Sequence, residues 1–142
     1  GTSYTSAIYD WLVANAAAKK MEIVIGLGDM TNDDTEAEWL LAQKEIKKLD
    51  GVVPYVLNRG NPPHDRTGTF NTYFGPGTTY TAQVDGTMTA GAYENAYKLL
   101  TVGTTDYLIL MLDWGPTDPV LQWAGNVISQ YPNHRVIITT HA

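Results

Sequence analysis

The sequence predicts an α/β fold in which helices pack on a layered, mixed β-sheet. The first observation is that segments with helical periodicity alternate with short β-branched apolar runs along the chain. The second is a pair of apolar runs near residue 100 that flank a glycine-containing turn, which indicates a β-hairpin. The third is the length of 142 residues, which fits one domain over 1–142 with a core of its own.

The first half of the chain is predicted to alternate two helices with two buried strands. Ile8, Leu12 and Ala16 recur at helical spacing in the first helix. Thr35 lies three residues before Glu38, which is the spacing of a capping box at the start of the second helix. The predicted elements are a helix at 6–20, a strand at 21–27, a helix at 35–49 and a strand at 52–57.

The second half begins with a long segment that has no sustained period. Residues 66–96 are rich in Gly, Thr, Asn and Tyr, so we expect an irregular excursion with one short helix near Tyr73 or Glu94. Asp118 is expected to cap the last helix, with Pro119 at its first position. The other predicted elements are hairpin strands at 97–102 and 107–112 around a turn at 103–106, a helix to residue 131 and a strand at 135–140.

Charge and composition exclude several classes of function. The pI is about 4.8 and the formal net charge at pH 7 is −6. This negative charge would repel a phosphate backbone, so nucleic acid is not the expected main partner. Without cysteine, any metal site must use oxygen and imidazole ligands. No apolar run approaches the ~20 residues of a membrane span, so no membrane partner is expected. High Tyr, Thr and Gly usage favours a secreted bacterial protein already trimmed of its signal peptide, with the cytoplasm as the alternative.

Polar side chains follow three of the predicted strands. Asp29 follows the first strand, Asn61 and the pair His64-Asp65 follow the second, and His141 ends the last. Loops at the carboxyl ends of strands converge in layered α/β proteins, so these side chains are expected to meet. Their oxygen and imidazole donors suit Mn, Zn or Fe sites that activate water for attack on phosphorus.

These motifs resemble those of the calcineurin-like metallophosphoesterases. The family's Gly-Asp-x-x-Asp signature is similar to Gly28-Asp29-Met30-Thr31-Asn32-Asp33, and its Gly-Asn-His-Asp signature is similar to Gly60-Asn61-Pro62-Pro63-His64-Asp65. The run from Val136 to His141 resembles the strand that delivers a further histidine ligand. The fold implied is a metallophosphoesterase-like partial α/β sandwich.

The resemblance implies a role for each of five residues. Asp29 would bridge two metal ions, and Asn61 and His141 would bind the second of them. His64 would protonate the leaving group, and Asp65 would orient His64. The implied activity is hydrolysis of a small-molecule phosphomonoester or phosphodiester by a metal-bound water.

Two departures from the family pattern limit that activity. Pro62-Pro63 separates Asn61 from His64, which displaces the imidazole by up to ~7 Å if both prolines are extended. The family's Asp-x-His and Gly-His-x-His motifs are also missing from residues 1–142. We therefore expect one weakly bound ion, in the second position, and an impaired enzyme. The alternatives are a non-catalytic fragment or reduced relative that binds a ligand or partner, and a homo-oligomer that forms through an open sheet edge.

The same residues also have structural interpretations. Asp29 could be a turn residue or helix cap, Asn61 could serve turn geometry, and His64 could be a solvated loop histidine. Asp113 could line a cleft or pack beneath it, with packing favoured. The aromatic side chains of the long loop could form a substrate wall or pack over the sheet; they include Phe70 and Phe74.

Overall fold

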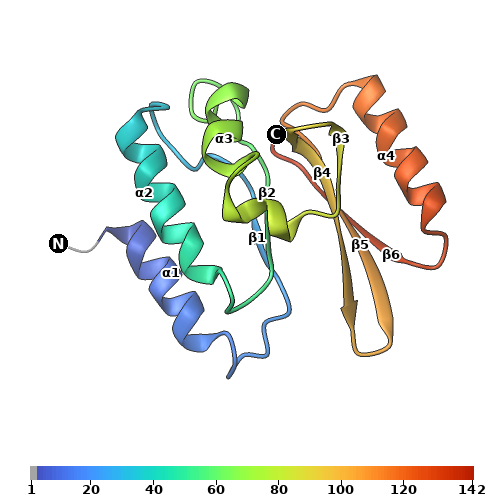
Figure 1. Cartoon of the computed structure of the whole chain (residues 1–142), viewed down its shortest axis with the longest axis horizontal. Helices are drawn as coiled ribbons and strands as arrows, with labels where there is room; N and C mark the ends of the chain where they lie inside the picture. Colours follow the sequence, from blue (N-terminus) through green and yellow to red (C-terminus); the bar gives the residue numbers. More distant parts are fainter. Residues whose placement is uncertain (1–2) are drawn as a thin grey trace.

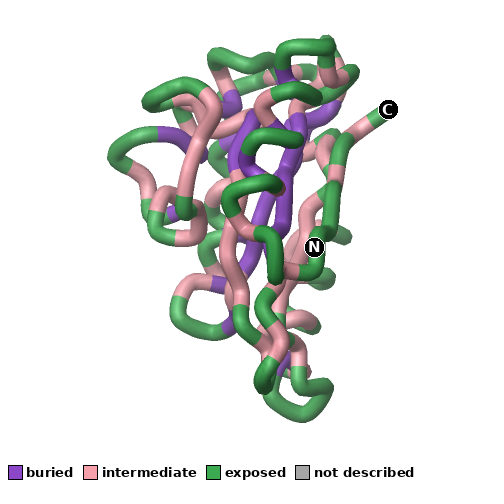
Figure 2. Tube along the Cα trace, turned by 90° about the vertical axis from the view of Figure 1, so that its right-hand side faces the viewer, coloured by how far each residue is buried: buried purple, intermediate pink, exposed green. Residues whose placement is uncertain are grey.

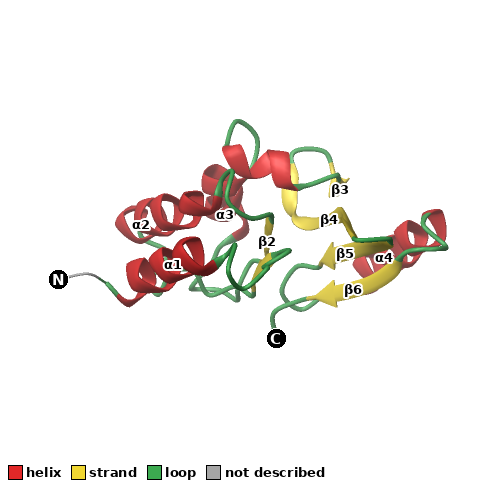
Figure 3. Ribbon diagram, turned by 90° about the horizontal axis from the view of Figure 1, so that it is seen from below, coloured by secondary structure: helices red, strands yellow, loops and turns green. Residues whose placement is uncertain are grey.

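Two β-sheets lie between two layers of helices in the computed structural model, which describes residues 3–142 (Figures 1 and 3). The helices are α1 (Tyr4–Asn15), α2 (Glu36–Ile46), α3 (Thr67–Phe74) and α4 (Asp118–Gln130), with short 3₁₀ turns at Lys47–Leu49 and Thr79–Gln83. The strands are β1 (Val24–Gly26), β2 (Tyr55–Leu57), β3 (Gly86–Thr89), β4 (Ala92–Val102), β5 (Thr105–Met111) and β6 (Arg135–Thr139).

The smaller sheet consists of β1 and β2, which run parallel. Val24 pairs with Tyr55 and Gly26 with Leu57. Parallel strands need a crossover connection, and α2 supplies it between these two strands. Both strands therefore end at the same edge of the sheet.

The larger sheet is mixed, with the order β3-β4-β5-β6. The pairs β3-β4 and β4-β5 are antiparallel, whereas β5 and β6 are parallel and joined by α4. Gly103, at φ 61°, and Thr104 form the two-residue turn between β4 and β5. A glycine with positive φ at the first turn position is typical of tight hairpins, because its backbone twist matches that of the strands.

Alternating side chains of the strands bind the layers together. Leu108 and Leu110 of β5 pack toward α4, in a cluster completed by Leu112, Val120, Ala124 and Val127. Ile109 and Met111 point to the other face, where they pack with Val56 of β2 between the sheets. The result is a helix–sheet–sheet–helix sandwich, in which the buried residues are concentrated in the central strands (Figure 2).

The third core cluster lies between the small sheet and its helices. Tyr55 and Leu57 face helices α1, α2 and α3, opposite to Val56. Trp39 of α2 is fully buried there and stacks on Tyr73 with ring centroids 5.7 Å apart. Phe70 and Phe74 are also buried in this cluster, so they pack over the sheet and do not form a substrate wall.

The α/β class with a mixed sheet and packed helices is confirmed. The capping box is confirmed as well, since the Thr35 hydroxyl accepts from the Glu38 amide and Glu38 accepts from the Thr35 amide. The first helix begins earlier and ends sooner than predicted, because Ser3 caps it and the chain reverses through Lys20 at φ 52°. At the start of α4 the cap is Thr117, one residue before the predicted Asp118.

The prediction for residues 66–96 was correct near Tyr73, which lies in α3, and wrong at Glu94, which lies in β4. The β3 strand and the first half of β4 were missed, because their side chains are mostly half-buried and mixed in polarity. The hairpin strands are also longer than predicted. Asp106, which was predicted to lie in the turn, belongs to β5 and pairs with Thr101 of β4. Within residues 3–142, no helix combines the length and apolar character needed to cross a membrane.

Candidate metal centre

Three chain segments meet beyond the carboxyl ends of β1, β2 and β6. The segments after β1 and β2 touch at two glycines, because a Cβ on Gly28 would lie 2.7 Å from the Cα of Gly60. Gly28 and Asp29 both have positive φ, at 96° and 53°. This backbone conformation is open to glycine and tolerated by aspartate. The close approach brings Asp29 and Asn61 to the end of β6, where His141 lies.

The His141 ring is held between the other two side chains. Its Nε2 lies 3.1 Å from Asn61 Oδ1 and 3.3 Å from Asp29 Oδ1, and its Nδ1 lies 2.7 Å from the carbonyl oxygen of Leu27. The His141 side chain is 20% exposed and that of Asp29 is 40% exposed. The three donor atoms are therefore gathered at a place that solvent can reach.

The hydrogen bond to Leu27 sets the chemistry of the ring. Because a carbonyl can only accept, Nδ1 of His141 donates a proton to it, so Nε2 is the ring nitrogen that faces the two side-chain oxygens. A proton on Nε2 or a bound cation would each bridge this nitrogen and the two oxygens. Ligand atoms bound to zinc at about 2.1 Å in a tetrahedron are ~3.4 Å apart, which is close to the 3.3 Å between Nε2 and Asp29 Oδ1 and longer than the 3.1 Å between Nε2 and Asn61 Oδ1. The donor set thus fits a small divalent ion.

Asp65 joins the loops that carry Asp29 and Asn61. Its carboxylate accepts hydrogen bonds from the amides of Met30 at 2.9 Å, Thr31 at 3.1 Å and Gly60 at 3.0 Å. The side chain is fully buried. The expected orientation of His64 by Asp65 has no counterpart among these hydrogen bonds, because the carboxylate accepts from two amides of the neighbouring loop and one of its own loop.

His64 is positioned by a different contact. Its Nδ1 lies 2.7 Å from the carbonyl oxygen of Asn32, at an exposed position. The prolines before it do not form an extended spacer, because the Asp65 amide donates to the Asn61 carbonyl at 3.2 Å and closes a turn over residues 61–65. Residues 61–65 therefore form a turn and lack the extended prolines for which a displacement of ~7 Å was expected.

Three residues that sequence reasoning did not assign to the site hold its loops on the larger sheet. Asn58 is buried, and its amide donates to the carbonyls of Leu112 at 3.0 Å and Thr139 at 3.1 Å, at the ends of β5 and β6. Arg59 pairs with Asp113 at 2.6 Å and also donates to the Asp65 carbonyl at 2.7 Å. Asp113 thus packs beneath the site, as favoured from the sequence. The only sequence signal for Asn58 and Arg59 was their place directly after a buried strand.

The loop after Asp29 is secured by Glu38. Its carboxylate accepts from the amides of Asn32 and Thr35, each at 3.1 Å, and from the Thr35 hydroxyl at 2.7 Å. These hydrogen bonds, first among them that of the Thr35 hydroxyl, lower the pKa of Glu38 to about 2. Asn32 and its neighbour Asp33, whose amide also donates to Glu38, therefore belong to a stabilised loop.

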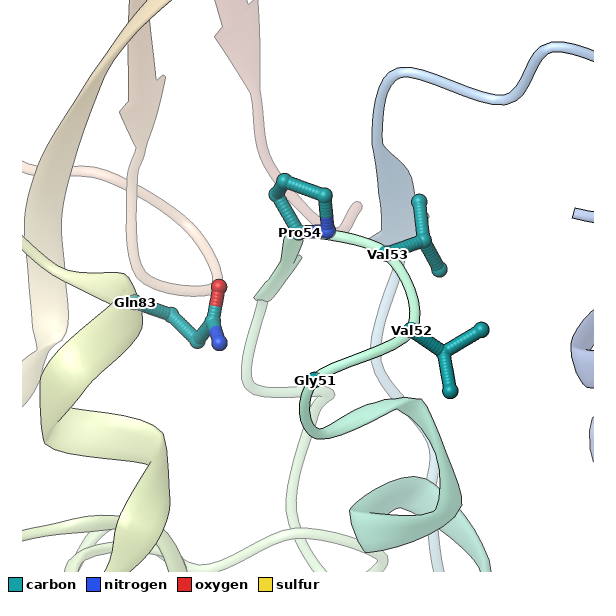
Figure 4. Close-up of a pocket in the computed structure, with 5 residues that line it drawn as sticks. All are labelled: Gly51, Val52, Val53, Pro54 and Gln83. Carbon is teal, nitrogen blue, oxygen red and sulfur yellow. The ribbon is translucent and has the colours of Figure 1, made fainter. Parts of the chain in front are cut away.

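Two hollows lie at opposite ends of the small sheet, and they differ in chemistry. A cleft of about 240 Å³ runs between α1 and the end of β1, with Asp29, Tyr9 and Thr5 among its lining residues. Burial raises the pKa of Tyr9 above its ordinary value. A second hollow lies at the start of β2 and is lined by Gly51, Val52, Val53, Pro54 and Gln83 (Figure 4). Its lining carries no titratable side chain, and Gln83 accepts from the Tyr55 amide, so the second hollow offers no catalytic group.

The metal ligands predicted from the sequence are thus brought together, and their roles stay predictions. Among residues 3–142, no three His, Cys, Asp or Glu side chains form a group that could hold a metal ion. The cluster described above has one carboxylate and one imidazole, and its third donor is the amide oxygen of Asn61.

Comparisons with known proteins give one similarity of sequence. The chain is 27% identical over 144 residues to a Bacillus subtilis (strain 168) protein described as "Uncharacterized protein YvnB". The match covers 93% of this chain and 11% of the length of that protein. No family model matches the chain, and no solved structure matches it.

Proposed function

We propose that this chain carries a metal-dependent phosphoesterase-type hydrolase site that acts on a small phosphomonoester or phosphodiester. The observation that supports this proposal best is the convergence of Asp29, Asn61 and His141 from three different strands, with donor atoms 3.1 and 3.3 Å apart. Bound there, a divalent ion supplies a Lewis acid that activates water and offsets charge on the phosphoryl oxygens.

Asp29, Asn61 and His141 would each contribute a different kind of ligand atom to such an ion. Asp29 contributes the negative charge, Asn61 a neutral oxygen and His141 the nitrogen. Three protein ligands leave a coordination position for water or substrate, as in catalytic zinc sites. The hydrogen bond from Nδ1 of His141 to Leu27 fixes the tautomer that can bind metal. One ion of Mn, Zn or Fe is the expected occupancy.

His64 is the proposed proton donor to the leaving group. Nδ1 is engaged with the Asn32 carbonyl, so Nε2 is the ring nitrogen that is free to exchange a proton. Asn32 belongs to the loop after β1, which also carries Asp29. The His64 ring is thereby tied to the same loop as the proposed ligand.

The decisive experiment measures metal binding and turnover in the same set of variants. Titration calorimetry with Mn²⁺ and Zn²⁺, and hydrolysis of an aryl phosphodiester, would compare wild type with Asp29→Ala and His141→Ala. His134→Ala is the matched control, because the His134 ring packs edge-on against Tyr131, away from these loops. We expect at least a ~10-fold loss of metal affinity in the two site variants and none in the control.

The outcomes separate the two candidate functions. Binding and turnover that are both lost in Asp29→Ala and His141→Ala support the enzyme. Binding without turnover in wild type supports the alternative, a non-catalytic module that keeps the site for a ligand or partner. Equal metal affinity in wild type and all three variants contradicts a metal site at these residues.

A further inference from the structure

The cleft between α1 and the end of β1 is bordered by small residues. Gly26, the last residue of β1, lines it without a side chain, and a Cβ there would lie 2.9 Å from the Cδ2 atom of Leu57. Ala42 of α2 also lines the cleft and carries only a methyl group. Because protein interiors are otherwise close-packed, larger side chains at these positions would fill part of the volume of about 240 Å³.

The lining changes from apolar at the floor of the cleft to polar at its mouth. Ala42, Ile46 and Leu57 are buried apolar residues and form the floor. Leu27 and Asp29 are exposed and lie at the mouth. A ligand that enters the cleft would therefore bury an apolar group against the floor and keep its other end beside the Asp29 carboxylate.

The charges of the lining favour a neutral ligand group. Among the described residues that border the cleft there is no Lys or Arg, and Asp29 is the one carboxylate. Burial raises the pKa of the Tyr9 phenol, so this side chain also stays neutral at neutral pH. A negatively charged group in the cleft would lose water and find no cation to pair with, which is costly.

The cleft shares its mouth with the proposed metal centre. The Leu27 carbonyl lies 2.7 Å from Nδ1 of His141, and Asp29 Oδ1 lies 3.3 Å from Nε2 of the same ring. Leu27, Gly28 and Asp29 all line the cleft as well. A phosphoryl group bound to an ion beside Asp29 could therefore direct its organic substituent into the cleft.

We propose that the cleft binds the organic substituent of the phosphoester, and that this substituent is neutral, apolar and about the size of one aromatic ring. The inference rests on the proposed function and adds the class of substrate to it. A cavity of about 150 Å³ lined by apolar side chains can hold benzene, so about 240 Å³ has room for a phenyl ring or a short alkyl chain. Substituents that carry further phosphate groups are disfavoured by the absence of cations from the lining.

The first test follows the binding of phenol to the metal-free protein by NMR, at the methyl groups of Ile46 and Leu57. Ala42→Leu should fill the cleft and weaken phenol binding by at least ~10-fold. Ala37→Leu is the matched control, because it is the same substitution at an exposed position of α2 outside the cleft. If Ala42→Leu does not fold, Thr5→Leu fills the cleft from the side of α1.

The second test compares phenylphosphonate with methylphosphonate by titration calorimetry on the Zn²⁺-loaded protein. The two probes carry the same charged group and differ in the size of the apolar substituent. Wild type and Ala37→Leu should bind phenylphosphonate at least ~10-fold more tightly than methylphosphonate, because the ring leaves water. In Ala42→Leu that preference should fall to within ~2-fold, since the ring no longer fits.

The outcomes distinguish failure of this inference from failure of the proposed function. Equal affinity of wild type for the two phosphonates overturns the inference, and so does a preference for phenylphosphonate that Ala42→Leu leaves unchanged. Phenol that shifts neither Ile46 nor Leu57 overturns it as well. If phenol enters the cleft but neither phosphonate binds, the metal site itself is contradicted, and the assignment of the cleft to a phosphoester is overturned with it.

Discussion

The buried carboxylate of Asp65 offers a sharp test of how the site is assembled. Its Oδ2 accepts from the amides of Met30 and Gly60, and its Oδ1 accepts from Thr31. Replacing Asp65 with Asn keeps the shape and turns one acceptor into a donor. If the amide nitrogen takes the Oδ1 position, it faces the Thr31 N–H, which then has no acceptor.

The cost follows from these three hydrogen bonds. A buried donor left unsatisfied costs about 1–3 kcal/mol, and loss of the negative charge weakens the two remaining bonds by about 1 kcal/mol in total. We therefore expect Asp65→Asn to lower the free energy of unfolding by about 2–4 kcal/mol. The unfolding entropy of a 142-residue chain is about 0.3 kcal/mol/K, so Tm should fall by roughly 7–13 °C.

Urea and thermal unfolding, followed by circular dichroism, would measure this loss. Asp33→Asn is the matched control, because it is the same substitution at an exposed position in the loop after β1. It should change stability by less than about 0.5 kcal/mol. An Asp65→Asn protein as stable as wild type but with altered turnover would refute the structural assignment. That result would restore the role in orienting His64 that the family resemblance implies.

Three further predictions concern the supports of the site. Glu38→Gln should lower the free energy of unfolding most above pH about 4.5, because only an ionised Glu38 accepts all the hydrogen bonds of the loop. The difference in stability from wild type should vanish as the pH falls to about 2, and acid titrations of both proteins would measure it. Ile109→Ala should cost about 2–5 kcal/mol in urea unfolding, since Ile109 is fully buried between the sheets. Asp113→Ala should cost about 3–5 kcal/mol, because it leaves the guanidinium of Arg59 buried without its partner; Asp113→Ala combined with Arg59→Met should recover part of that loss.

Periodicity predicted the parts of the fold in which one face of an element is buried. In α2 the buried side chains Trp39, Ala42 and Ile46 recur at helical spacing, so the buried face of this helix is visible in the sequence. The strands of the small sheet were predicted at the right places but too long. In this fold the ladder between β1 and β2 covers three residues on each side. The ends of such short strands depend on their partners, which the local sequence does not encode.

The hairpin of β3 and β4 shows where local sequence fails. Gly86 lies against the ring of Tyr97, and the register between the strands shifts between Thr87 and Thr89. An irregular pair breaks the strict alternation by which a strand is recognised. Asn71 of α3 also bonds to the Tyr93 amide at 2.7 Å, so part of the support for β4 comes from a distant helix.

The proposed metal ligands could be predicted from the sequence, but the hydrogen bonds that hold their loops in place could not. Asp29, Asn61 and His141 each follow an apolar run, and loops at the carboxyl ends of strands converge in layered α/β proteins, so their meeting was predicted even though their strands belong to two sheets. Apart from the contact between Asp65 and the nearby Gly60 amide, the hydrogen bonds of the Asp65 and Asn58 side chains depend on backbone groups 34 to 81 residues away. No spacing in the sequence reports such contacts.

The glycines of the site serve the packing of its loops, whereas the proposed ligands would bind the metal. A Cβ on Gly28 would lie 2.7 Å from the Cα of Gly60 and 3.0 Å from Nδ1 of His141, and the φ of Gly28 is 96°. Any other residue at this position would force apart the loops that bring Asp29 to His141, whether or not an ion binds. Gly28 of the Gly28-Asp29 motif is therefore required by the packing of these loops. The role of a metal has to be tested at the donor side chains, because changing the glycine would disrupt the loops in either case.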